Sequence, residues 1–130
     1  MKSETRIERS GRILKDLKNK YPGKDCFDVD GGGTHFAAEV EPTKEHPEYD
    51  RAVEVVISTK PHKHHKMTQE YTIISGVLEL HDGEKIIILN QGDKHTVFPE
   101  NIHWAKSING ECWMEVYSKP GWTREDHILV

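Results

Sequence analysis

Short runs of β-forming residues, separated by turn signals, are the feature that most constrains how this chain can fold. Six runs cover residues 34–41, 52–59, 69–80, 84–90, 94–98 and 111–118. Turn signals rich in Gly, Pro, Asn and Asp recur between them, about every 8–15 residues. No helical pattern separates the runs, so a parallel α/β sheet is not expected. The pattern predicts an antiparallel sandwich or barrel.

Two dipeptides in these turns are typical of tight hairpins. Asp82-Gly83 and Asn109-Gly110 each lie beside β-forming runs, and both predict a hairpin between adjacent strands. The glycines at 31–33 have neither a following helical pattern nor the Lys-Ser/Thr of a phosphate-binding loop. We interpret them as a flexible turn.

The N-terminal part of the chain predicts one short helix. Ser10 is the expected N-cap, Ile13, Leu14 and Leu17 fall at helical spacing, and the residues at 21–23 end the helix. This spacing supplies a single apolar stripe. The helix is therefore expected to lie on the outside of a larger body.

The chain has the length of one domain, at 130 residues. We expect residues 1–50 to form the helix and leading strands, packed on the barrel. Residues 51–130 are expected to form the barrel core and a C-terminal tail. Both parts belong to one structural domain.

Composition excludes several classes of partner. Only 35% of residues are apolar, and the longest apolar run, at 86–89, is far too short to span a membrane. The net charge is −4, and both signs are interspersed; nucleic acid is therefore not an expected partner. Cys26 and Cys112 are too few for a disulfide framework, so both are expected to be reduced and a cytoplasmic location is expected.

Histidine is the compositional excess that points to chemistry. The chain has nine histidines, and three of them fall within residues 62–65. On a strand, His62 and His64 lie on one face, whereas on a helix they diverge by about 200°. Because the neighbourhood is β-like, these two imidazoles can converge on one ion. With His103 and one oxygen ligand, they form a set that suits a divalent first-row metal.

The same residues resemble the small single-domain cupins. The first cupin motif has a Gly, His-x-His, Glu and a final Gly at fixed spacing. This chain matches it with His62, His64 and Gly76, but has Val56 in place of the first Gly and Gln69 in place of the Glu.

The second cupin motif follows after fifteen residues, at 77–91. Gly92 and His103 match it at the right separation. Phe98, Glu100 and Ser107 replace its Pro, Gly and Asn, although Pro99 lies one position later. The resemblance extends over about residues 51–120.

The resemblance implies an all-β fold, an antiparallel double-stranded β-helix or jelly-roll barrel with a metal inside its open end. By position, the metal ligands are His62, His64, Gln69 and His103. Glu70 is the alternative fourth ligand, although strand parity would point it to the opposite face. A neutral amide ligand leaves the ion a stronger Lewis acid, which favours polarising a carbonyl or hydroxyl over redox chemistry. Zn, Mn, Fe, Ni and Cu all accept such a set, so the metal identity stays open.

The remaining histidines and one tryptophan have weaker assignments. Trp104 either forms a wall of the pocket or packs outward at a dimer face. We interpret His65 as a solvent-exposed neighbour of the ligands. His95 either lines the barrel mouth or lies at the surface, and we favour the surface. Turn or surface positions are expected for His35, His46, His81 and His127.

Four further residues are candidates for catalysis. Tyr71 shares the parity of Gln69 and is expected to face the interior, as a packing residue or a pocket donor. Glu54, Glu115 and Tyr117 are candidates for a general acid or base. Sequence alone does not fix which sheet face carries these three.

Three functions are consistent with these residues. The leading hypothesis is a metal-dependent isomerase or lyase that acts on a small polar molecule such as a sugar or sugar acid. The runner-up is an iron- or nickel-dependent dioxygenase, and the third is a cupin that binds a metal or small molecule without turnover. The resemblance also implies a homodimer.

Overall fold

The computed structural model describes residues 3–130, so Met1 and Lys2 of the predicted N-terminal segment lie outside the described residues. The described residues form one α-helix, one 3₁₀ turn and a series of short strands. Their bounds are α1 Arg6–Lys20, β1 Cys26–Asp28, β2 His35–Glu41, β3 Asp50–Val56, β4 His62–Lys63, β5 Thr68–Ser75, β6 Leu78–Asp82, β7 Lys85–Leu89, β8 Lys94–Val97, β9 His103–Ser107, β10 Cys112–Lys119, the 3₁₀ turn Arg124–Asp126 and β11 Ile128–Leu129.

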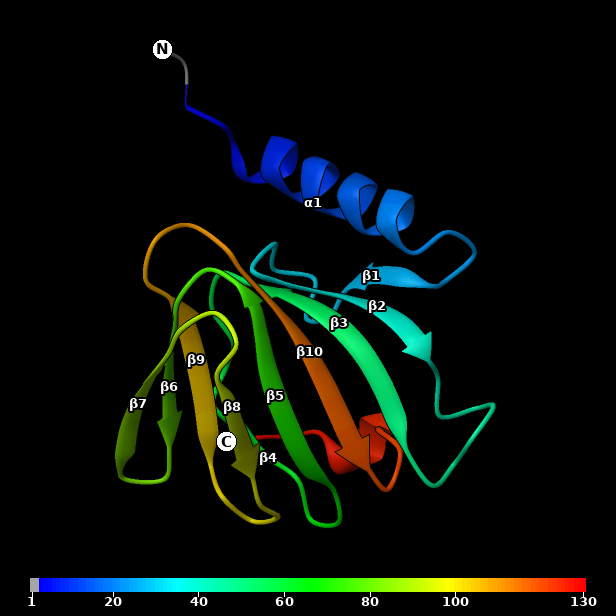
Figure 1. The fold of residues 1–130 in the computed structure, drawn as a ribbon, viewed down its shortest axis with the longest axis vertical. Helices are drawn as coiled ribbons and strands as arrows, with labels where there is room; N and C mark the ends of the chain where they lie inside the picture. Colours follow the sequence, from blue (N-terminus) through cyan, green and yellow to red (C-terminus); the bar gives the residue numbers. More distant parts are fainter. Residues whose placement is uncertain (1–2) are drawn as a thin grey trace.

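The strands form two antiparallel sheets that face each other. One sheet has the order β1-β2-β3-β10-β5-β8, and the other has the order β11-β4-β9-β6-β7. Apolar side chains from both sheets, including Tyr71, Leu80, Val97 and Met114, pack together between them. Figure 1 shows α1 lying over the β1–β2 side of the larger sheet. The predicted all-β jelly-roll class with an N-terminal helix is confirmed.

Both faces of β2 and β3 are covered, and this fixes their register. Phe36 on β2 and Val53 and Val55 on β3 pack against Ile13 and Leu17 of α1. The alternate residues of the same strands therefore point between the sheets. A slip of one residue would exchange these two sets, so burial on both sides specifies which side chains enter the barrel.

The helix begins one turn earlier than predicted. Thr5, and not Ser10, is the N-cap: its hydroxyl accepts a hydrogen bond from the Glu8 N–H at 3.1 Å, and Glu8 Oε1 accepts one from the Thr5 N–H at 3.0 Å. This reciprocal pair is a capping box, of which the Thr5-x-x-Glu8 pattern is the sequence signature. The helix ends as predicted, with Tyr21 as its C-cap.

Two turn predictions need correction. The predicted strand 69–80 is two strands, β5 and β6, because Gly76 has φ +89° and a Cβ there would lie 2.8 Å from the Glu111 carbonyl oxygen. Asp82-Gly83 forms the predicted hairpin between β6 and β7. Asn109-Gly110 is a turn but not a hairpin, since β9 and β10 belong to different sheets.

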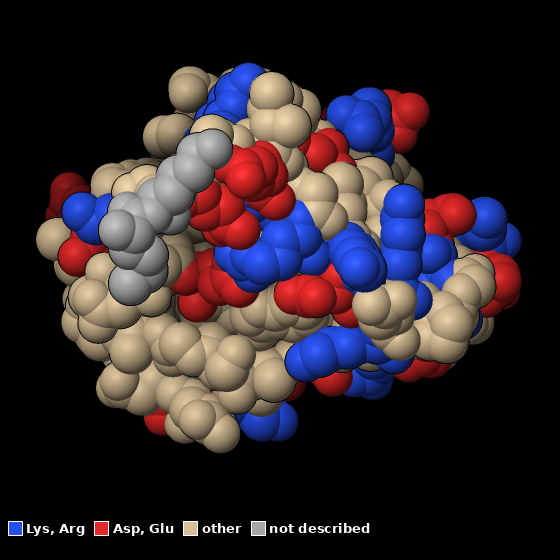
Figure 2. Space-filling view, turned by 90° about the horizontal axis from the view of Figure 1, so that it is seen from above, with Lys and Arg blue, Asp and Glu red and all other residues tan. Residues whose placement is uncertain are grey.

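Charged side chains of both signs share the surface above α1. Seen from the side of α1, Lys and Arg lie among Asp and Glu (Figure 2). None of the helices within residues 3–130 has the length and apolar character needed to cross a bilayer. Cys26 and Cys112 are both free thiols. The cytoplasmic location, the homodimer and the division of the chain at residue 50 stay predictions.

The apolar stripe of α1 generates the first testable prediction. Leu17 is completely buried, so Leu17→Ala should lower the free energy of unfolding by about 2–5 kcal/mol, through lost apolar contacts and the cavity left behind. Urea denaturation followed by circular dichroism measures this change. Ile7 lies on the same helix but is 80% exposed, so Ile7→Ala is the matched control, with an expected change within about 0.5 kcal/mol. Equal stability of the two variants would show that the helix does not pack as described.

Candidate metal and substrate site

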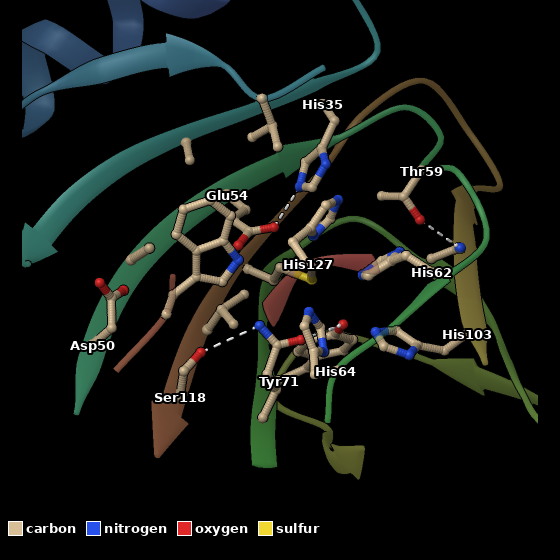
Figure 3. A pocket seen from close by; sticks show the side chains of 18 of the residues that line it. His35, Asp50, Glu54, Thr59, His62, His64, Tyr71, His103, Ser118 and His127 are labelled. Carbon is tan, nitrogen blue, oxygen red and sulfur yellow. Dashed lines mark hydrogen bonds and ion pairs between the residues drawn. The ribbon is translucent and has the colours of Figure 1, made fainter. Parts of the chain in front are cut away.

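The three histidines of the two motifs meet at one point between the sheets. His62 lies on β4 and His103 opens β9, and their Cα atoms are partners in the antiparallel ladder. His64 follows β4 directly. One nitrogen from each ring lies within 4.8 Å of the others. Figure 3 shows these imidazoles on one side of a pocket that extends along β3.

Hydrogen bonds from the backbone fix which ring nitrogen faces the pocket. His62 Nδ1 lies 2.7 Å from the Lys60 carbonyl oxygen, and His103 Nδ1 lies 2.9 Å from that of Asn101. A carbonyl oxygen only accepts, so each Nδ1 carries the proton and each Nε2 keeps its lone pair. The backbone thus presents two imidazoles in the tautomer that a metal ligand needs.

Burial keeps the three rings neutral. It lowers the pKa of His62 to about 2 and that of His64 to about 3, with a further contribution from neighbouring histidines. Burial also lowers the pKa of His103. Desolvation disfavours the charged imidazolium, so all three rings offer lone pairs at neutral pH.

These residues fit a divalent transition metal. The Nε2 atoms of His64 and His103 are fully buried and have no hydrogen-bond partner, although the two side chains are only 2% and 1% exposed. A buried polar atom without a partner is costly, and coordination to an ion removes that cost. His62, His64 and His103 would hold the ion, as the cupin resemblance implies.

Gln69 lines the same pocket and Glu70 does not. Gln69 is 5% exposed, and its amide donates to Ser118 Oγ at 3.2 Å. Its side-chain oxygen accepts from the Tyr71 hydroxyl at 3.2 Å. Glu70 points to the opposite face and lies 3.9 Å from Lys94, as strand parity predicted. Coordination by Gln69 stays a prediction.

Two of the four catalytic candidates enter the pocket. Tyr71 is buried there, and burial raises the pKa of its phenol, so the hydroxyl keeps its proton. Glu54 also lines the pocket, and its Oε1 lies 2.5 Å from His35 Nε2. Burial opposes a charge on His35, but the Glu54 carboxylate outweighs it and raises the pKa of this histidine.

Glu115 and Tyr117 lie outside the pocket, which corrects their assignment as acid or base candidates. Both occupy the face of β10 opposite to Met114 and Val116, whose side chains line the pocket. Glu115 forms an ion pair with Arg51, and the Arg51 guanidinium also lies over the Tyr117 ring. Alternation along β10 therefore removes both from the chemistry.

His35 and His127 are pocket residues that the sequence analysis missed. Both were assigned to turns or surfaces, yet both line the pocket. The His127 ring centroid lies 4.5 Å from that of His62. His35 enters because β2 alternates between α1 and the pocket. His127 enters because β11 pairs with β4, a contact between distant segments that no local pattern signals.

Asp126 anchors the tail to the loop that carries His64. Its carboxylate accepts hydrogen bonds from the backbone N–H groups of His65, Lys66 and Met67, at 2.8–3.3 Å. The side chain is only 7% exposed. The C-terminal tail therefore docks on its own barrel, where β11 pairs with β4, and the Asp126 carboxylate holds the backbone just after His64.

A second hydrogen-bond network connects His103 to the neighbouring strands. Asp82 is the ladder partner of His103, and its Oδ2 lies 2.8 Å from His95 Nε2. The Asn101 amide donates to Asp82 Oδ1 at 3.3 Å, while the Asn101 carbonyl accepts from the His103 ring. His95, assigned to the surface, is in fact half-buried and supports the ligand strand.

Glu100 shows how the chain tolerates a departure from the cupin motif. It stands where the motif has Gly and adopts φ 72°, a left-handed conformation that usually favours glycine. Its N–H donates to the His64 carbonyl at 2.7 Å, and its carboxylate lies 2.6 Å from His65 Nδ1. Glu100 thus forms this backbone hydrogen bond to His64 although it is not a glycine.

The other histidines and Trp104 have structural contacts. His65 is exposed, as predicted, with the Glu100 contact described above. His81 stacks on Trp104 with ring centroids 3.8 Å apart, and Trp104 also lines the pocket. His46 stacks on Tyr49 in the loop before β3.

Comparisons with known proteins identify the fold. No protein-family profile and no curated protein matches the chain. Solved structures do match it. KdgF from Halomonas sp. is 20% identical with a TM-score of 0.65, covering 78% of this chain and 91% of that one. The Streptomyces nucleoside dehydratase Pac13 is 16% identical with a TM-score of 0.70, covering 85% and 87%.

A third similar structure is described as a double-stranded β-helix. An uncharacterized Klebsiella pneumoniae protein with a double-stranded β-helix domain is 23% identical, with a TM-score of 0.61 and coverage of 73% of this chain and 89% of that one. At these identities the likeness establishes the fold alone. The chain thus has the double-stranded β-helix fold of the cupins, with the histidine triad inside it.

The Asp126 contacts generate a prediction about metal affinity. Asp126→Asn replaces one acceptor oxygen with a donor that faces N–H groups, so the loop carrying His64 should lose its fixed position. We expect Zn²⁺ affinity to fall about tenfold and the free energy of unfolding to fall by about 1–3 kcal/mol. Competition titration against a chromophoric chelator measures the affinity.

Glu125→Gln is the control for this variant. Glu125 is the exposed neighbour in the same 3₁₀ turn, so its substitution should leave Zn²⁺ affinity unchanged. If Asp126→Asn bound Zn²⁺ as tightly as the wild type, the tail would not contribute to the metal site.

Proposed function

We propose that this protein is a metal-dependent lyase or isomerase that acts on a small polar substrate. The observation that carries the proposal is the joint placement of two features in one pocket. One is the neutral imidazole triad, and the other is the Glu54 carboxylate held by His35. Such a pair of features can fix substrate oxygens and move a proton between neighbouring atoms.

The triad supplies the first part of this chemistry. His62, His64 and His103 would hold a divalent ion, which would supply a Lewis acid able to polarise a carbonyl or hydroxyl oxygen of the substrate. His62 and His103 are pre-oriented for this by their backbone hydrogen bonds. Tyr71 contributes as a positioning residue, since its hydroxyl orients the Gln69 amide.

Glu54 supplies the second part. Its side chain is mostly buried, and its Oε1 lies 2.5 Å from His35 Nε2. A carboxylate in this position accepts a proton from a substrate C–H or O–H group beside the polarised oxygen. Returning that proton to a neighbouring atom gives isomerisation, and delivering it to a departing hydroxyl gives elimination.

The comparison structures support this class without defining the substrate. Pac13 is named as a nucleoside dehydratase and is described with uridine. Dehydration is an elimination, which agrees with the lyase proposal. A sugar, a sugar acid and a hydroxy acid are all substrates on which the described residues could act.

Proton exchange tests the proposal without knowledge of the product. Zn²⁺- or Mn²⁺-loaded protein is incubated in D₂O, without oxygen, with a panel of aldoses, uronates and nucleosides, and deuterium incorporation is followed by proton NMR. We expect exchange or elimination with at least one compound, and a fall of about 10²–10⁴-fold in its rate for Glu54→Gln. Glu115→Gln is the control, because Glu115 lies outside the pocket.

Two outcomes would contradict the proposal. Turnover that requires Fe²⁺ and O₂ would favour the dioxygenase alternative. Stoichiometric metal with no exchange across the panel would favour a cupin that binds without turnover.

A further inference from the structure

The pocket continues well beyond the triad, to a second polar end. Asp50, Ala52 and Glu54 line it from β3, and Glu39 lines it from β2. Asp50 lies four residues from Glu54 along an extended strand, which is a separation of about 13 Å. Figure 3 shows Asp50 at one edge of the pocket and the triad at the other. This acid end, Glu39 and Asp50, takes no part in the function proposed above.

The described walls of the pocket are rich in carboxylic side chains. Among residues 3–130, the pocket is lined by three carboxylic side chains, Glu39, Asp50 and Glu54, and by no Lys or Arg. Carboxylate and phosphate groups of ligands are usually bound by Arg or Lys. The acid end therefore lacks the side chains that would recognise an anionic group.

Asp50 is held as a hydrogen-bond acceptor. It is 3% exposed, and its Oδ2 accepts from the Thr43 N–H at 3.1 Å. The Thr43 hydroxyl lies 2.8 Å from the same oxygen and 2.8 Å from the Trp122 carbonyl oxygen. Asp50 is thus fixed by Thr43 on one side, next to the segment that brings Trp122 into the pocket wall.

Glu39 adds an unpartnered oxygen to the acid end. Its Oε2 is buried and has no hydrogen-bond partner, although the residue lines the pocket. Burial and the contact with Asp50 raise the pKa of Glu39. A ligand hydroxyl can donate to the free Glu39 oxygen.

A buried atom outside the triad is also without a partner in this pocket. His35 is 6% exposed and lines the pocket, and its Nδ1 has no hydrogen-bond partner. Trp122 adds an aromatic surface near Asp50. An indole face packs well against the apolar face of a sugar or base ring.

We propose that the pocket takes a neutral, hydroxyl-rich ring compound, which lies between the triad and the acid end. Glu39 and Asp50 bind hydroxyl groups of the ring, and Trp122 packs against its face. The corresponding carboxylated or phosphorylated compounds are rejected, because their charge meets Asp50 with no Lys or Arg beside it. This proposal rests on the proposed function, because it places the ligand in the same pocket. It does not depend on which reaction takes place there.

Matched ligands that differ only in charge test the proposal. One set is uridine, uridine 5′-monophosphate and 5′-amino-5′-deoxyuridine, and the other is methyl glucoside, methyl glucuronide and methyl 6-amino-6-deoxyglucoside. Binding to Zn²⁺-loaded protein is measured by isothermal titration calorimetry. In at least one set, the neutral member should bind about tenfold or more tightly than the anionic member, and no less tightly than the ammonium member.

Variants of the acid end make the test specific. Glu39→Ala and Asp50→Asn should each weaken binding of the neutral ligand about five- to tenfold at unchanged Zn²⁺ stoichiometry. Glu39→Gln, whose amide still donates and accepts, should restore most of the affinity lost in Glu39→Ala. Glu48→Gln is the control, because Glu48 is exposed in the loop before Asp50.

The outcomes separate this proposal from the proposed function. Tightest binding of an anionic or an ammonium member, equal binding of all members, or no binding in either set would overturn it. Neutral-ligand binding that depends on Glu39 and Asp50, without proton exchange, would uphold the selectivity and contradict the lyase or isomerase proposal. Proton exchange with a uronate alone would uphold the lyase or isomerase proposal and contradict the selectivity for neutral compounds.

Discussion

The candidate site depends on three uncharged imidazoles that are buried together, with one nitrogen of each ring within 4.8 Å of the others. Each buried nitrogen without a partner costs about 1–3 kcal/mol, and two of these atoms have none. Backbone hydrogen bonds support this arrangement, since the Lys60 and Asn101 carbonyl oxygens accept hydrogen bonds from the Nδ1–H groups of His62 and His103. Coordination of a divalent ion would satisfy these nitrogens, so the free energy of metal binding would offset the cost of burying them.

Alternation along β2 and β3 connects this site to the fold. One face of these strands packs under α1, so the other face must point between the sheets, and it carries His35, Glu39, Asp50 and Glu54. The helix, although far from the triad, thereby determines which carboxylates enter the pocket. The C-terminal tail acts from the other side, where Asp126 and β11 hold the segment with His62 and His64.

Much of this could be predicted from the sequence, because the relevant patterns are local. Turn spacing predicted an antiparallel fold, His-x-His followed by His103 predicted the triad, and parity predicted that Gln69 rather than Glu70 faces inward. The errors have a common cause. Glu115 and Tyr117 lie on the partly exposed face of β10, but the first three residues of the strand are all buried, so hydrophobicity there does not reveal which face is inside. His127 depends on pairing between segments more than sixty residues apart, which no local spacing encodes.

The most direct test of the central claim is X-ray absorption spectroscopy of the Zn²⁺-loaded protein, compared with a His103→Ala variant. The account predicts a wild-type shell with three imidazole nitrogens at about 2.0–2.1 Å and oxygen in the remaining positions. The variant should retain two imidazoles or lose the ion. A wild-type shell with fewer than two imidazoles, or one that His103→Ala leaves unchanged, would contradict the account.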